Sequence, residues 1–241
     1  MTRIAIIAAL SGELKHMVRG WAHERSDGVD LWQTRHENAK WIAACAGMGQ
    51  QAAVRAFAEV EKGGPVDRVV SVGWAGALRE EIGVGRAYRA AGVVDLRTGE
   101  RFAVSEPNAG DPWLVTSSGV VGAADKRRLA AEYLAGLVDM EAAAIARLAA
   151  MRGIPFECVK GVSDGVSENL PDFNRFISPQ GQLILSRLLL FVLPRPWYWP
   201  ALIRMGENSS KASHSLAGLL LENLETPGDK SNPNGDSNLS R

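Results

Sequence analysis

The sequence contains little cysteine, no excess of either charge and no long apolar run. Only Cys45 and Cys158 occur in 241 residues, both in apolar surroundings and without a CxxC spacing or a histidine cluster, so neither a disulfide framework nor a zinc site is expected. Lys+Arg and Asp+Glu number 27 each, which removes the global electrostatic argument for nucleic-acid binding. No run reaches the ~18 apolar residues of a membrane-spanning helix, and the first apolar run is too short for a signal peptide. We therefore expect a cytoplasmic protein.

Short apolar runs alternate with helical segments through most of the chain. Runs at 3–9, 66–72 and 155–159 are typical of strands buried on both faces, and helices are expected at 50–61 and 139–152. Strands that alternate with helices predict a mainly parallel sheet with right-handed crossovers and with helices on both faces.

The remaining segments complete a three-part organisation. Further helices are expected at 11–19, capped by Ser11, and at 121–133 and 173–193. The charges of the helix at 121–133, Lys126 among them, are expected on its solvent side. The predicted parts are a catalytic domain (1–193), an aromatic linker followed by an amphipathic helix (194–225), and a disordered tail (226–241).

Acidic residues and glycines follow the expected strands. Glu13, Glu141 and Asp164 each come near the end of an apolar run, and each alone has a structural explanation as a helix-start or turn residue. Glycine pairs follow two other strands, in Ala46–Gly49 and Gly73–Gly76, where backbone can approach a ligand closely. Because the carboxyl ends of parallel strands share one edge of a sheet, their convergence predicts a small-ligand site.

Five segments, in this order, resemble the purine nucleoside phosphorylase superfamily, and within it the methylthioadenosine/S-adenosylhomocysteine nucleosidase branch. They are IAIIAALSGE (4–13), AGMG (46–49), VGWAGAL (72–78), VDMEA (138–142) and VSD (162–164). The resemblance implies a three-layer α/β fold, with a central mixed, mainly parallel sheet flanked by helices. It also implies a small-molecule purine nucleoside as partner, no nucleic acid, no metal or other cofactor, and a homodimer.

The resemblance implies a role for each matching residue. Asp164 would protonate or hydrogen-bond N7 of the departing purine, Glu141 would accept hydrogen bonds from the ribose hydroxyls, and Glu13 would activate the attacking water. Cleavage of an N-glycosidic bond through an oxocarbenium-like state needs such an acid and such a carboxylate. An aspartate is ordinarily ionised at neutral pH, so Asp164 needs burial or a hydrogen bond to keep a proton, whereas Glu141 is expected to act ionised with no unusual pKa. The other implied substrate-binding residues are Met140 against the sugar, Ser163 and Val120 near the base, and Met48 and Gly76 in the two glycine turns.

Three features depart from that branch. Trp74 stands where a small hydroxyl residue is usual, so it would border an altered mouth of the site. Lys160 stands where an arginine is usual, which keeps the charge and loses the planar fork. The segment between Gly85 and Trp113 is shorter than in the nucleosidases, which suggests an opened site or a larger substrate.

These departures leave several functions open. Hydrolysis is favoured over phosphorolysis because Glu13 would repel phosphate, although an inward-pointing Lys160 would offset that repulsion. The opened site and the aromatic tail also resemble hopanoid-associated members of the superfamily, which remove adenine from adenosyl-hopane, with 194–225 as a peripheral membrane or lipid contact. The same helix could instead pack on its own domain or on a partner subunit. A catalytically degenerate nucleoside-binding module is the non-enzymatic alternative.

Overall fold

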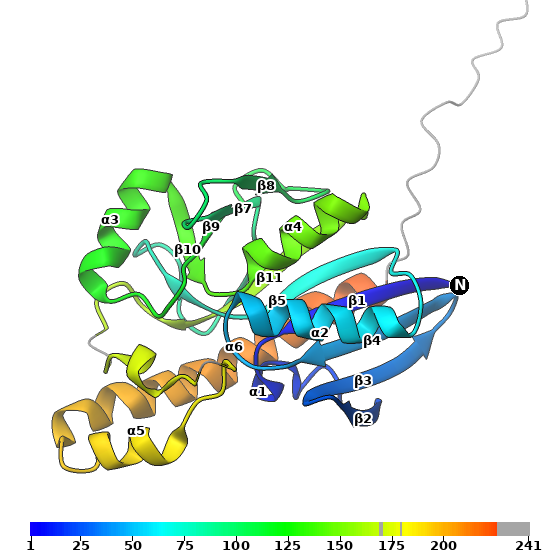
Figure 1. Ribbon diagram of the computed structural model, residues 1–241. Coiled ribbons are helices and arrows are strands. Elements are labelled where there is room, and N and C mark those ends of the chain that lie inside the picture. The colour runs from blue at the N-terminus through cyan, green and yellow to red at the C-terminus, as the bar shows by residue number, and fades with distance from the viewer. Residues whose placement is uncertain (169–170, 179, 226–241) are drawn as a thin grey trace, which may run out of the picture.

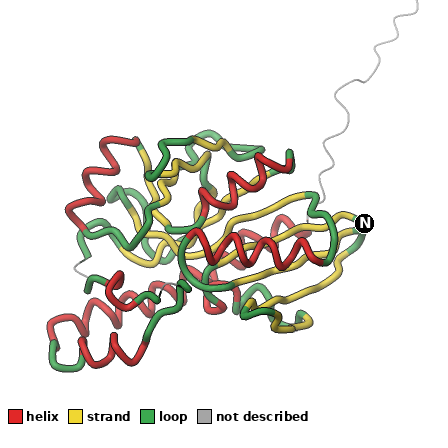
Figure 2. The backbone as a smooth tube through the Cα atoms, viewed as in Figure 1, coloured by secondary structure: helices red, strands yellow, loops and turns green. Residues whose placement is uncertain are grey.

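The computed structural model of the protein describes residues 1–168, 171–178 and 180–225, which form a mixed sheet between layers of helices (Figures 1 and 2). The sheet has 11 strands in the order β2-β3-β4-β1-β5-β10-β9-β7-β8, with β11 beside β5 and β6 beside β11. The strands are β1 (Thr2–Ala8), β2 (Ala22–Ser26), β3 (Val29–His36), β4 (Ala39–Cys45), β5 (Arg68–Ala77), β6 (Ala87–Arg89), β7 (Gly92–Asp95), β8 (Arg101–Ala103), β9 (Trp113–Thr116), β10 (Ala135–Asp139) and β11 (Phe156–Asp164). The helices are α1 (Ser11–Leu14), α2 (Gln50–Lys62), α3 (Ala123–Tyr133), α4 (Ala142–Arg152), α5 (Leu185–Val192) and α6 (Trp199–Glu225), with short 3₁₀ turns η1 (Phe173–Phe176) and η2 (Pro196–Tyr198).

Strand direction brings the ends of four strands together. Strands β4, β1, β5 and β11 are mutually parallel neighbours, so their carboxyl ends lie at one edge. Strand β10 runs antiparallel to β5 and pairs Val138 with Gly76, which are close to the carboxyl ends of both strands. The carboxyl ends of these strands therefore lie close together, as the sequence predicted, although Gly73–Gly76 lie within β5 and not in a turn after it.

Helices cover both faces of the sheet. Helices α2 and α4 pack on one face, where the core includes Phe57, Ile145 and the alanines of both helices. Helices α1 and α6 cover the other face with Leu14, Leu216 and Leu220. Helix α6 lies so close to β11 that a Cβ added at Gly161 would be 2.9 Å from the Cβ of Ala212. This three-layer α/β architecture is the one expected from the sequence.

Two helix predictions were wrong. The helix expected after residue 11 ends at Leu14. The helix expected at 173–193 is instead η1, an irregular stretch and then α5, because the Gly181 carbonyl accepts a hydrogen bond from the Met48 N–H (2.8 Å) and Ile177 bridges Leu183. The predicted disordered tail, 226–241, lies outside the described residues. Among the helices that the structure describes, none has an apolar stretch long enough to cross a bilayer.

Candidate active site

A cavity of about 220 Å³ lies where the carboxyl ends of β5, β10 and β11 meet the turns that follow β1, β4 and β10. Nine of the ten site residues predicted from the sequence line it; the exception is Lys160. The nine are Glu13, Met48, Trp74, Gly76, Val120, Met140, Glu141, Ser163 and Asp164. Leu10, Phe173, Leu183 and Met205 add apolar walls. The cavity therefore combines four carboxyl groups, those of Glu13, Asp139, Glu141 and Asp164, with a largely apolar lining.

Glu13 is held by the backbone of two turns. Its Oε2 accepts hydrogen bonds from the N–H groups of Ala9 (2.8 Å) and Leu10 (2.9 Å), and its Oε1 accepts one from Trp74 N–H (2.8 Å). Burial raises the pKa of Glu13 above its ordinary value, against the opposing effect of these N–H groups and of the Lys160 charge. The glycine at 73 is required here, because a Cβ at Gly73 would be 2.9 Å from Oε1. A carboxylate has about four acceptor positions, so three backbone bonds leave one for a water molecule.

Glu141 ends the β10–α4 connection and is the N-cap residue of α4. Its Oε1 accepts a hydrogen bond from Gly49 N–H (2.5 Å), and its Oε2 accepts one from Met140 N–H (3.2 Å). Burial, with the neighbouring Asp139 charge, raises the pKa of Glu141 to about 8, although Lys160 opposes this. The expectation of an ordinary pKa was wrong, because the sequence did not show how fully this carboxyl leaves water. Glu141 is mostly protonated at neutral pH when the cavity holds no ligand.

Asp164 forms an ion pair with Lys126, a residue that the sequence analysis placed on the solvent side of its helix. The Lys126 side chain is only 4% exposed, and its ammonium contacts both Asp164 Oδ2 and the Gly165 carbonyl, the latter at 2.6 Å. Ser163 Oγ donates to Asp164 Oδ1 at 2.7 Å. Gly76 makes room for this pair, since a Cβ there would lie 3.1 Å from both Asp164 Oδ2 and Lys126 Nζ. Asp164 is thus oriented by two donors, one of which is a cation inside the cavity.

Lys160 lies beneath the cavity and does not line it. Its ammonium is 2.9 Å from Asp139 Oδ2 and 3.2 Å from Ser71 Oγ, and the residue is fully buried. Burial works to lower the pKa of Lys160, but the nearby carboxylates, Asp139 foremost, hold it above its ordinary value. Lys160 therefore balances the carboxyl groups around it, and its charge is not available to an anion in the cavity.

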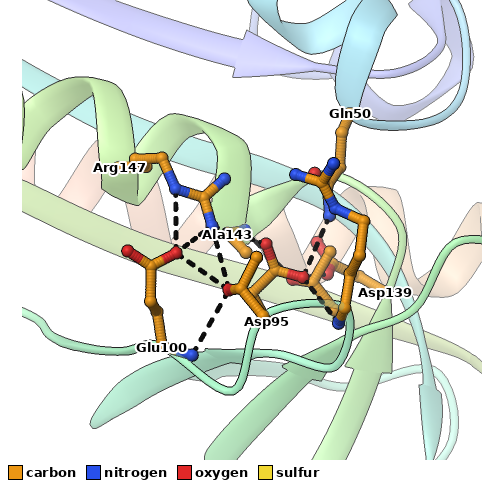
Figure 3. Close-up of polar contacts among 9 residues, drawn as sticks. Gln50, Asp95, Glu100, Asp139, Ala143 and Arg147 are labelled. Atoms are coloured by element: carbon orange, nitrogen blue, oxygen red, sulfur yellow. Dashed lines mark hydrogen bonds and ion pairs between the residues drawn. The ribbon is translucent and has the colours of Figure 1, made fainter.

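A polar network fixes the start of α4, which carries Glu141. Asp139 accepts hydrogen bonds from Thr116 Oγ1 (2.7 Å) and Ala142 N–H (2.9 Å), and Thr116 in turn accepts one from Ala143 N–H. Figure 3 shows Arg147 of α4 reaching Asp95 and Glu100 beside this group. The Arg147–Asp95 ion pair measures 2.7 Å, and Asp95 is fully buried. The network sets the position of Glu141 relative to β7 and β10.

Trp74 joins the site to α6. Its indole N–H donates to Ser213 Oγ (3.0 Å) and to the Ser209 carbonyl (3.2 Å), while its backbone N–H holds Glu13. Ser213 Oγ also donates to the Gly12 carbonyl in the turn that carries Glu13. Helix α6 is therefore attached to the turn that carries Glu13.

Sequence reasoning missed the contributions of Lys126 and of the segment after residue 172. The solvent-side reading of Lys126 followed from its charged neighbours, and no local signal showed that this one side chain turns inward. Among the side chains that the structure describes, no group of three His, Cys, Asp or Glu residues could hold a metal ion.

Comparison with known proteins agrees with this geometry. A model of the Phosphorylase superfamily matches residues 3–118 and 113–190. A search of curated proteins gave no match. Among solved structures, 5'-methylthioadenosine/S-adenosylhomocysteine nucleosidase from Helicobacter pylori superposes with a TM-score of 0.71 at 16% identity, covering 92% of this chain and 97% of that one.

Two further structures are similar to the same extent. Futalosine hydrolase of Helicobacter pylori has a TM-score of 0.70 at 15% identity and covers 92% of this chain and 97% of its own. Arabidopsis thaliana 5'-methylthioadenosine nucleosidase has a TM-score of 0.70 at 16% identity, covering 95% and 98%. At these identities the likeness establishes the fold. Because the family match spans more than half of the residues, including all four carboxyl groups of the cavity, the chain belongs to the phosphorylase superfamily.

Proposed function

We propose that this protein is a nucleosidase, which hydrolyses the N-glycosidic bond of a 5'-substituted purine nucleoside and releases adenine. The observation that carries the proposal is the convergence of Glu13, Glu141 and Asp164 on one cavity with apolar walls. Each carboxyl group sits in a different environment: Glu13 on backbone N–H groups, Glu141 beside another acid, and Asp164 beside a cation. Three environments suit three different tasks.

The reaction needs a proton for the departing base. The C1'–N9 bond breaks, its electron pair passes to the purine, and N7 accepts a proton. The Lys126 ammonium contacts Asp164 Oδ2, so its proton can pass through Asp164 to N7, which leaves a neutral Lys126 amine and an Asp164 carboxylate. Val120 and Phe173 line the cavity and offer apolar surface to the ring.

The two glutamates would bind the sugar and activate the nucleophile. Glu141 would accept hydrogen bonds from the ribose 2'- and 3'-hydroxyls, and its ionised form accepts such bonds most strongly. Glu13 has one acceptor position left by its backbone bonds, so it can orient a water toward C1' and take its proton as the oxocarbenium-like state forms.

Water suits this cavity better than phosphate. Among the described residues that line it there is no arginine, and its one lysine is paired with Asp164. Lys160, which the sequence analysis left open as an anion-binding residue, is paired with Asp139. A phosphate dianion would therefore meet the Glu13 carboxylate with no unpaired cation among these described lining residues, and their repulsion is strong in a poorly hydrated site.

A lipid-like 5'-substituent is a second candidate, supported by one observation. Leu183, Phe173 and Met205 line the cavity, and they also belong to the apolar cluster formed by η1, α5 and the start of α6. An apolar group could extend along this wall, as the resemblance to the adenosyl-hopane-cleaving members implies. The short polar 5'-groups of ordinary nucleosides would gain nothing there.

The deciding experiment measures free adenine from a panel of adenosines. The panel carries 5'-hydroxyl, 5'-methylthio and 5'-long-alkyl groups, each tested with and without phosphate. We expect phosphate-independent release with a free sugar as co-product and with the highest kcat/KM for the apolar 5'-groups. Sugar 1-phosphates whose formation rises with phosphate would overturn hydrolysis, and absence of adenine release from every member would favour the degenerate binding module. The proposed homodimer is tested separately by light scattering.

A further inference from the structure

The helical hairpin formed by α5, η2 and the first turns of α6 displays apolar side chains to solvent. Figure 1 shows this hairpin, in yellow and orange, extending from the body of the protein. Its inner side is packed: Leu188 and Val192 of α5 are buried in one cluster with Phe173 and Phe176, against which Leu202 and Met205 of α6 pack. Its outer side is not packed against other residues that the structure describes. Seven large apolar residues are substantially exposed there: Leu185, Leu189, Leu190, Leu193, Trp197, Trp199 and Ile203.

These residues form one continuous surface. On α5 the exposed leucines recur at intervals of four, one and three residues, which places all four on one side of the helix. Trp197 and Trp199 follow at the turn, where they are 65% and 46% exposed. Ile203 lies one helical turn after Trp199 and is 62% exposed. Exposed leucines beside tryptophans at a hairpin tip are the composition of a membrane-interface element.

The charge of the hairpin indicates which kind of surface it would bind. From Leu185 to Gly206, which is the hairpin itself, the sequence holds three arginines (187, 195 and 204) and neither an acidic residue nor a lysine, in a protein with no net charge overall. Arg187 and Arg204 are exposed. Arg195 lies over the Phe191 ring at 4.1 Å and donates to the Phe191 carbonyl, which keeps its positive charge at the base of the tip. Positive charge beside exposed apolar surface matches anionic lipid headgroups above acyl chains.

We propose that this hairpin docks the protein on an anionic lipid surface, with Leu185, Leu189, Leu190, Leu193, Trp197 and Trp199 entering the interface. The sequence analysis placed such a contact at 194–225, whereas the structure assigns it to 185–204, because the later part of α6 is buried against β11 and α1. Docking puts the apolar wall of the cavity, Leu183 and Met205, directly behind the membrane-facing side chains.

The docking inference does not depend on the proposed catalytic activity. Binding to vesicles is measured without substrate, so its failure and a failure of the nucleosidase proposal are distinguishable. The partner is the lipid surface itself, and no nucleoside is needed to observe it.

The experiment is co-sedimentation of the full chain with phosphatidylcholine vesicles, with and without 30% phosphatidylglycerol. We expect binding to the anionic vesicles that weakens with salt and falls at least tenfold without phosphatidylglycerol. The double variant Leu190→Ser/Trp197→Ser should lose at least tenfold in binding, since each removes an apolar group that the interface would bury. Its matched control is Leu134→Asn/Met151→Ser, two residues that are 73% and 74% exposed elsewhere, which should bind as wild type.

A charge-reversal pair tests the second part of the argument. Arg187→Glu/Arg204→Glu should lose binding to the anionic vesicles, because each arginine near an anionic surface raises the binding affinity about fivefold. The control Arg19→Glu/Arg35→Glu changes the net charge equally at exposed positions outside the hairpin and should bind nearly as wild type. Brominated lipids should quench tryptophan fluorescence in the wild type and less in Trp197→Phe/Trp199→Phe.

Three results would overturn the proposal. Absence of vesicle binding by the wild type rejects docking, and equal loss in hairpin and control variants rejects the hairpin as its location. A dimer in light scattering that dissociates in Leu190→Ser/Trp197→Ser, with no vesicle binding, would assign the surface to a second copy of the chain instead.

Discussion

The raised pKa of Glu141 predicts how the stability of this protein changes with pH. In the native state burial raises that pKa to about 8, whereas the ordinary value is 4.5. Folding therefore takes up a proton between these two values. The native state is stabilised fully below pH 4.5, and that stability is lost as the pH rises toward 8. Between pH 6 and pH 8 the loss amounts to about 2 kcal/mol, or about 4–8 °C in Tm for a protein of this size.

The variant Glu141→Gln isolates this contribution. An amide does not titrate and can still accept from Gly49 N–H, so the difference in stability between wild type and variant should change by about 2 kcal/mol over the same range. Glu106→Gln, at an exposed glutamate, is the matched control and should give a constant difference. Urea unfolding at half-unit pH steps supplies the measurement. Parallel stability curves for wild type and Glu141→Gln would refute a proton-holding Glu141.

The raised pKa of Glu141 also predicts that protons are released when a nucleoside binds. With a pKa of about 8, about nine tenths of Glu141 is protonated at pH 7. Ribose hydroxyls donating to it would favour the ionised form, so binding of a non-cleavable nucleoside should release up to about 0.9 proton. Calorimetry in two buffers of different ionisation enthalpy measures that number. Equal proton release by wild type and Glu141→Gln would remove Glu141 from the sugar site.

Four other substitutions test the rest of the site. Asp164→Asn should lower kcat by about 10²–10⁴-fold with the fold intact, since general acid catalysis contributes that much, and a wild-type rate in single-turnover assays would exclude Asp164 as the acid. Lys126→Met should lower kcat and change its pH–rate profile, whereas an unchanged profile with only a lower Tm would make the lysine purely structural. Trp74→Phe loses the indole hydrogen bonds to α6 and should cost about 1–3 kcal/mol in urea unfolding; no change would show that α6 is held by its apolar contacts alone. Gly161→Ala places a Cβ 2.9 Å from Ala212 and should cost about 1–3 kcal/mol, and a neutral result would mean that α6 shifts freely on β11.

The positions of the site residues along the chain could be predicted from the sequence, because each of these residues belongs to a short local motif. Each of Glu13, Glu141 and Asp164 comes near the end of a strongly apolar run. Gly73 and Gly76 of β5 allow carboxyl groups to approach the strand closely, and this requirement can be recognised at single positions. Once the runs are strands of one sheet, parallel pairing of β1, β5 and β11 brings their ends together. The three-layer fold follows from this, while the resemblance to the nucleosidase branch supplied the ten predicted site residues, nine of which line the cavity.

Only the tertiary structure decided the charge state of the site, because that depends on burial and on partners distant in sequence. Lys126 lies on a helix of charged residues and meets Asp164 38 positions later, while Lys160 turns to Asp139 and away from the cavity. The pKa of Glu141 rises because burial removes its carboxyl group from water and because Asp139 and Glu13 lie nearby, although the Lys160 charge opposes the rise. The sequence likewise shows an apolar, arginine-bearing segment after residue 172, but not which of its leucines pack inward and which face solvent. The tertiary structure decides this through two contacts. Gly181 bonds to Met48, and Leu188 and Val192 pack on Phe173 and Phe176.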